Sequence, residues 1–186
     1  MSFNLLRFFP CSLTGGIALE VFEAVRTVLA VRAYTDMPVP PEVVRRIVEA
    51  GRLTASSMNG QPWHFIVVEN RDTLRQLGGL ARTGPYIAQA PVAIVVVMEQ
   101  SPYAVSDASR AIQSMILTGW SEGIGSNWIG FQGLAEVKTL LGIPGHLEVL
   151  AIVPFGYSAE APRRGKKKRK SLSEVAHRER FGQPFE

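Results

Sequence analysis

The sequence predicts a single α/β or α+β domain in which helices pack on a mixed sheet. Helical and strand patterns alternate along the 186 residues. One of the strand patterns, Pro91–Met98, is apolar throughout, which is typical of a strand covered on both faces. The length suits one domain, and the sequence contains no internal repeat and no second core.

The first half of the domain is expected to hold three helices and one strand. Apolar residues at helical spacing predict the first helix, and Pro40-Pro41 opens the second, with Glu42 in its first turn. Leucines three residues apart predict the third. The expected helices are 19–30, with Leu19, Phe22 and Val25 on its apolar side, 41–51 and 71–80, and the expected strand is 64–69.

The second half is expected to add three strands and two helices. The longer helix presents Ala108, Ala111, Ile112 and Met115 on one side, so it should lie centrally against the sheet. The expected strands are 91–98, 126–131 and 149–155, and the expected helices are 107–122 and 134–141.

Residues 1–19 differ from the rest of the chain. The stretch from Leu5 to Cys11 is too short for a signal peptide and is interrupted by Arg7 and Pro10. A Gly-Gly linker composition follows. We expect an irregular N-terminal arm over 1–19 and one domain over 20–186.

Composition excludes several classes of protein. No apolar run approaches the roughly 20 residues that a membrane helix needs. The single cysteine, Cys11, rules out an internal disulfide and fits a reducing cytoplasm. The three histidines are scattered, so we expect no metal site.

The basic character of the chain is local. Seven of the eight residues from Arg163 to Lys170 are basic, so a net charge of +4 leaves −3 on the rest. Nucleic acid is one interpretation of such a run, but no aromatic or recognition-helix context accompanies it. The other two interpretations of the run are a solvated tail and a clamp for a phosphate group.

The most informative segment is the polar loop Ser56–Gln61, which leads through Pro62 into an apolar strand. Its hydroxyl and amide groups donate and accept hydrogen bonds without carrying charge. Such a cluster suits a flat heteroaromatic ring better than an anion or a metal. A capped turn that satisfies only local backbone groups is the alternative.

Known hydrolytic and nucleotide motifs are missing from the sequence. It contains no Gly-x-Ser-x-Gly elbow, no Walker loop and no zinc-protease helix. The pair Gly123-x-Gly125 lacks the third glycine of the dinucleotide fingerprint and follows a helix rather than a strand. A Rossmann NAD site is therefore not expected.

Four segments in order give a family resemblance. Ser-Ser-x-Asn-x-Gln-Pro-Trp-x-Phe, from Ser56, follows the Val31–Val39 segment and precedes Glu122–Gly130 and Pro154–Tyr157 with its basic run. Together they resemble the FMN-dependent nitroreductase family over most of the chain. The resemblance implies an α+β, three-layer α/β/α fold with a central mixed sheet and helices on both faces.

The resemblance also implies a cofactor site. FMN would lie between two subunits of a homodimer, with the polar loop at the flavin ring and a backbone N–H of Ile129-Gly130 facing the flavin N5. A glycine suits that position because it lets the backbone approach a ligand closely. The implied cofactor-binding residues are Arg32, Ser56, Ser57, Asn59, Gln61, Ile129, Gly130, Lys167 and Arg169.

The phosphate end departs from the family pattern. The family usually has Arg-Arg-Ser-x-Arg at the end of the first helix, whereas this chain has Val28-Leu29-Ala30-Val31-Arg32. Lys167 and Arg169 match the family's late Lys-x-Arg pair, and we expect the basic run to replace the missing cations.

The leading interpretation is a cytoplasmic FMN-dependent oxidoreductase. NAD(P)H would reduce the flavin, and a nitroaromatic, quinone or related small-molecule acceptor would reoxidise it in a ping-pong cycle, with the flavin rather than a side chain carrying the chemistry. The alternative is a non-catalytic flavin or deazaflavin binding protein.

Overall fold

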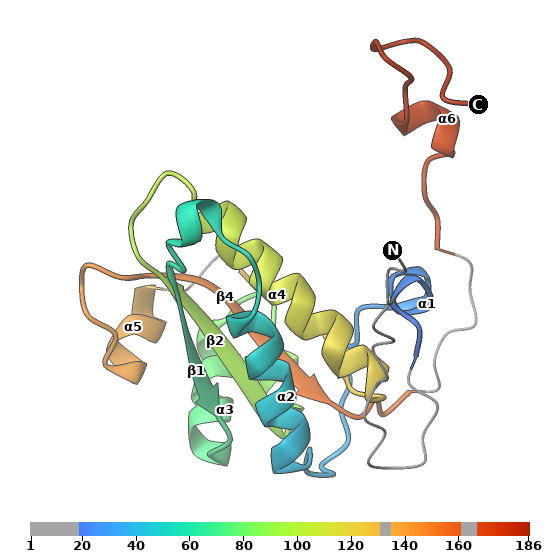
Figure 1. The fold of residues 1–186 in the computed structure, drawn as a ribbon. Coiled ribbons are helices and arrows are strands. Elements are labelled where there is room, and N and C mark those ends of the chain that lie inside the picture. The colour runs from blue at the N-terminus through green and yellow to red at the C-terminus, as the bar shows by residue number, and fades with distance from the viewer. Residues whose placement is uncertain (1–18, 131–134, 161–166) are drawn as a thin grey trace, which may run out of the picture.

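A computed structural model describes residues 19–130, 135–160 and 167–186, and a four-stranded sheet lies at its centre (Figure 1). The strand order is β1-β2-β4-β3, and all three strand pairs are antiparallel. One isolated parallel bridge, between Ala30 and Ser126, lies at the β3 edge of this sheet. The strands are β1 (Trp63–Val68), β2 (Val92–Met98), β3 (Gly125–Ser126) and β4 (Glu148–Gly156).

Helices cover both faces of this sheet, which confirms the three-layer prediction (Figure 1). The helices α2 (Pro41–Arg52) and α4 (Ala104–Ser121) pack on one face, and α3 (Arg71–Leu80) and α5 (Ala135–Leu141) pack on the other. Strand β2 is buried on both sides because its side chains alternate between the two cores: Val92, Ile94 and Val96 join one, and Ala93, Val95 and Val97 the other.

Local sequence explains why α2 and α3 begin where they do. Pro41 occupies the first turn of α2, where a missing N–H costs nothing. The Asn70 side chain caps α3 by accepting hydrogen bonds from the backbone of Asp72 and Thr73, each at 3.0 Å. Both helices match their predicted ranges within one residue.

The predicted first helix is wrong in its length and in its buried face. Helix α1 (Val21–Thr27) ends before Ala30 because Ala30 pairs with Ser126 at the sheet edge. Of its predicted inner side chains, Phe22 is 70% and Val25 47% exposed. The apolar face of α1 therefore has no cover from the described part of its own chain.

Two other boundaries differ from the predictions. The expected strand over 126–131 is only the short β3 and a bridge between Ile129 and Ile152, and Phe131 lies outside the described residues, as does Leu134 at the start of the expected fifth helix. Helix α4 starts at Ala104, earlier than Asp107. The N-terminal arm also falls outside the described residues, except for Leu19.

Two short 3-10 helices and a C-terminal segment complete the chain. They are η1 (Ser57–Asn59), η2 (Pro85–Gln89) and α6 (Leu172–Val175). The segment that carries α6 projects away from the sheet in Figure 1, and it leaves Leu172, Val175 and Phe181 exposed. No helix in the described ranges is long and apolar enough to cross a bilayer.

Candidate functional site

The polar loop has a strained backbone. Met58, Asn59 and Gln61 have φ angles of 52°, 54° and 48°, in the left-handed region that residues with a Cβ seldom adopt. Asn tolerates this region, whereas each of the other two costs about 1–3 kcal/mol. Such a conformation persists only when surrounding contacts hold it.

Hydrogen bonds within the loop supply part of that support. Ser56 Oγ accepts from the Gln61 backbone N–H at 2.9 Å. The Gln61 side-chain amide donates to the backbone and side-chain oxygens of Asn59, each at 3.3 Å. These bonds bring together three of the four loop residues that the sequence predicted, and they leave Asn59 and Gln61 exposed.

A buried carboxylate on α4 supplies the rest. Ser57 donates to both oxygens of Asp107, from its backbone N–H and from its hydroxyl, each at 3.1 Å. Asp107 is only 1% exposed and also pairs with Arg110. The Ser57 hydroxyl proton is thus committed to Asp107, and the Gln61 NH2 already donates to Asn59. Within the described loop, the exposed Asn59 NH2 and the Gln61 amide oxygen are the groups that can bond to a ligand.

Sequence reasoning missed Asp107 as a site residue and treated it only as the start of a helix. The sequence feature that could have indicated it is a charged residue on the same helix side as Ala108, Ala111 and Met115, all of which are buried. A carboxylate in such a position needs hydrogen-bond partners from another element.

On the opposite edge of the sheet, Ile129 and Gly130 follow β3. Ile129 exchanges backbone hydrogen bonds with Ile152, at 3.0 and 2.7 Å. A Cβ on Gly130 would lie 2.6 Å from Trp128 Nε1 and 2.8 Å from the Leu150 carbonyl oxygen. A side chain cannot be added there without displacing backbone, so the close packing requires glycine.

Cations gather at α1. Lys167 Nζ donates to the Val25 carbonyl oxygen at 2.7 Å. Desolvation, and then the charges of Arg169 and Arg26, lower the pKa of Lys167 below its ordinary value. We call Arg26, Lys167 and Arg169 the cation group. Because the two arginines repel the charge of Lys167, the group suits an anionic ligand.

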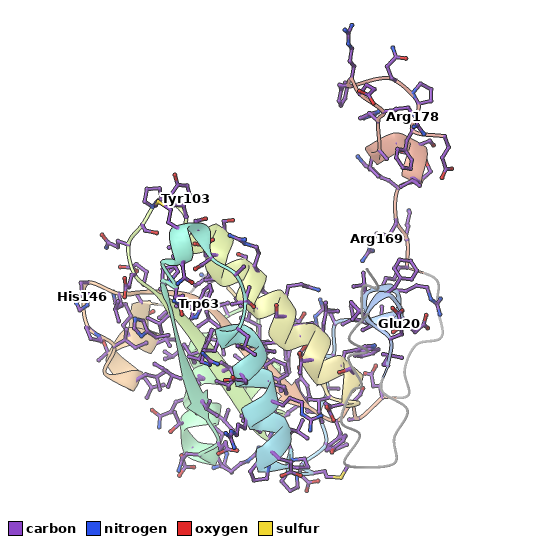
Figure 2. All side chains as sticks on the ribbon, viewed as in Figure 1. Glu20, Trp63, Tyr103, His146, Arg169 and Arg178 are labelled. Atoms are coloured by element: carbon purple, nitrogen blue, oxygen red, sulfur yellow. The ribbon has the colours of Figure 1, made fainter. Side chains whose placement is uncertain are left out.

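Arg26 is a second residue that the sequence analysis missed. It lies in the last turn of α1, just before the segment where the expected cations are missing, and it pairs with Glu23 at 2.5 Å. The sequence feature that could have indicated Arg26 is its position just before that segment. Of the basic run, Lys167 contacts α1, and Figure 2 shows Arg169 beside this helix.

Arg32 lies in a different setting. Burial is the main reason that the pKa of Tyr34 is raised, the Tyr86 charge adds to it, and the nearby Arg32 charge opposes it. Tyr86 accepts a hydrogen bond from the Asn127 side chain. Arg32 therefore lies near Tyr34, two residues after the Ala30–Ser126 bridge at the β3 edge.

The predicted site residues of one chain do not converge on one point. The polar loop touches Asp107 near the start of α4, whereas α1 meets its far end, where Trp120 donates to Thr27 at 2.9 Å. Asp107 and Trp120 are 13 positions apart, about 20 Å of helix. The loop also precedes strand β1, at one edge of the sheet. Ile129 pairs with β4 at the other edge, three strand spacings or about 14 Å from β1.

No group of three or more His, Cys, Asp or Glu side chains in the described ranges could hold a metal ion.

Comparison with known proteins decides the family. A model described as the nitroreductase family matches residues 26–100 and 81–157. The chain belongs to the nitroreductase family. Members of this family resemble it over most of its length, both in sequence and in structure.

Two relatives and one solved structure illustrate the similarity. A Methanothermobacter thermautotrophicus protein named "Putative NADH dehydrogenase/NAD(P)H nitroreductase" is 35% identical over 77% of this chain and 80% of its own length. A Bacillus subtilis NAD(P)H FMN reductase is 27% identical over 87% and 74%. The FMN-dependent nitroreductase of Clostridium difficile has a TM-score of 0.76, with 25% identity, over 85% of this chain and 98% of its own.

Proposed function

We propose that this nitroreductase-family chain is a homodimeric, FMN-dependent NAD(P)H oxidoreductase. The proposal rests on the split between the polar loop and the cation group. Since one chain holds them at opposite ends of α4, the loop of one subunit would complete the site with Ile129, Gly130 and the cation group of the other.

The residues present fit FMN. Exposed amides on Asn59 and Gln61 match the neutral polar atoms of a flavin ring. The cation group matches a phosphate, since charge-assisted bonds to phosphate are strong. Arg26, Lys167 and Arg169 together would compensate for the cations missing at Val28–Ala30.

The protein's own contribution would be orientation and electrostatics. FMN, when bound, supplies the hydride chemistry, with NAD(P)H as reductant. The polar loop would fix the plane of the ring, Gly130 would permit close backbone approach, and the cation group would hold the phosphate. A nitroaromatic, quinone or related small molecule would be the electron acceptor in a ping-pong cycle.

The exposed apolar side chains support the dimer. Phe22 and Val25 on α1, and Leu172 and Val175 on α6, are large side chains left uncovered. Obligate dimers commonly bury more than about 2,000 Å² in total. A second copy would cover these surfaces and bring the two halves of the site together.

The absorbance spectrum of the purified protein tests the function. A yellow protein whose colour NAD(P)H bleaches under anaerobic conditions, and which releases FMN on denaturation, supports it. A colourless protein that binds no added FMN contradicts it.

A non-catalytic flavin or deazaflavin binder is the second candidate, favoured by the apolar Val28–Ala30 segment. It predicts a bound chromophore that neither NADH nor NADPH reduces. Mass analysis of the released ligand separates FMN from a deazaflavin.

A further inference from the structure

Asp107 is a buried carboxylate that the proposed function does not itself use. It accepts two hydrogen bonds from Ser57, which lies 50 residues away in sequence, and it pairs with Arg110. The side chain of Arg110 is half exposed, so Asp107 is paired toward solvent and hydrogen-bonded toward the loop. Both oxygens of the carboxylate are thus occupied.

The residues next to Ser57 are those with the least favourable backbone. Met58 directly follows it, has a φ of 52°, and is 88% exposed, so its side chain gains little from packing. The conformation must therefore be imposed by the ends of the loop. One end is held by Ser57 on Asp107, and the other by Gln61 on Ser56.

We propose that Asp107 is a positioning residue that holds the polar loop in its ligand-binding conformation. The inference rests on the proposed function, since the ligand is the flavin. Asp107 does not touch the ring in this account. It acts through Ser57, so that Asn59 and Gln61 are presented before FMN arrives.

Two substitutions separate the hydrogen bonds from the negative charge. Asp107→Ala removes both bonds to Ser57, and we expect FMN to bind at least about tenfold more weakly. Asp107→Asn keeps one acceptor and one donor, and the Ser57 hydroxyl can rotate to accept. We expect its FMN affinity to stay within about threefold of the natural protein.

Ser114→Ala is the matched control on the same helix. Its hydroxyl accepts from Thr54 at 2.8 Å and donates to the Arg110 carbonyl oxygen at 3.2 Å, and neither partner belongs to the polar loop. FMN affinity is measured by quenching of flavin fluorescence, and the melting temperature of the flavin-free protein is measured in parallel. Ser114→Ala should leave FMN affinity unchanged.

A rescue experiment tests the strain directly. Glycine adopts positive φ without a Cβ penalty, so Met58→Gly in the Asp107→Ala background should recover part of the lost affinity. The melting temperatures of the flavin-free variants, measured in parallel, show whether the recovered affinity follows general stability or the loop conformation. A double variant no better than Asp107→Ala would overturn the proposal.

The remaining outcomes are equally decisive. If the natural protein binds FMN and Asp107→Ala binds it equally well, the positioning role is wrong while the proposed function stands. If Ser114→Ala weakens FMN as much as Asp107→Ala, the effect is general to the helix and the inference also fails. If the natural protein binds no FMN, the proposed function fails, and the positioning role of Asp107 fails with it.

Discussion

The polar loop and the cation group differ in how their own chain supports them. The loop is strained yet bonded to itself and to a buried carboxylate on α4. The cation group rests on α1, whose apolar side chains are uncovered, and on a segment that projects from the domain (Figures 1 and 2). One half of the proposed site is preorganised within a subunit, and the other would need a second subunit and an anion.

The largest expected effect comes from the uncovered face of α1. Phe22→Glu places a charge where we expect an apolar dimer contact, and burying an unpaired charge is costly. We expect light scattering at micromolar concentration to give a monomer of about half the natural mass, without bound FMN. Gln76→Glu, on the exposed face of α3, should leave a dimer.

A natural protein that is monomeric and still binds FMN would contradict the proposal that the site is divided between two subunits. The two halves of the site would then have to meet within one chain, against the separations along α4 and across the sheet.

The cation group should show the next largest effect. Lys167→Ala with Arg169→Ala removes two charge-assisted bonds of about 1.5–3 kcal/mol each, so FMN affinity should fall on the order of a hundredfold or more. Riboflavin, which lacks the phosphate, should be affected little. Titration by fluorescence quenching with both ligands measures the difference.

The loss in that double variant should persist at moderate salt, because partly buried pairs are screened less than surface ones. Equal FMN affinity before and after the change would make the basic run a solvated tail.

The polar loop should show a smaller effect. Asn59→Gly removes the amide but keeps a residue that accepts a φ of 54°. FMN affinity should fall about tenfold, with little change in the melting temperature of the flavin-free protein. Asn59→Leu would be a poorer test, because it removes the amide and adds left-handed strain at the same time. A sharp fall in flavin-free stability for Asn59→Gly would favour the capped-turn interpretation.

The smallest expected effect is on pH dependence. Desolvation and neighbouring cations lower the pKa of free Lys167, and a bound phosphate dianion would raise it again. FMN binding therefore takes up a proton between these two pKa values, and affinity should fall as pH rises through that window. Binding titrations from about pH 7 toward pH 10 should show a decline that Lys167→Ala abolishes.

Local patterns in the sequence determined most of the elements. The apolar run of β2, the proline at the start of α2 and the Asn70 cap of α3 each act within a few residues, so they can be recognised without the fold. The residue pattern of the polar loop and the order of the four segments likewise identified the family.

Tertiary structure alone decided what lies across long sequence separations. The bond from Ser57 to Asp107 and the end of α1 at the Ala30–Ser126 bridge depend on how the chain returns to itself. Periodicity shows which side chains are apolar but not what covers them, so Phe22 looked like core and is exposed. Spacing along the chain likewise could not show that the proposed site is divided between the two ends of α4.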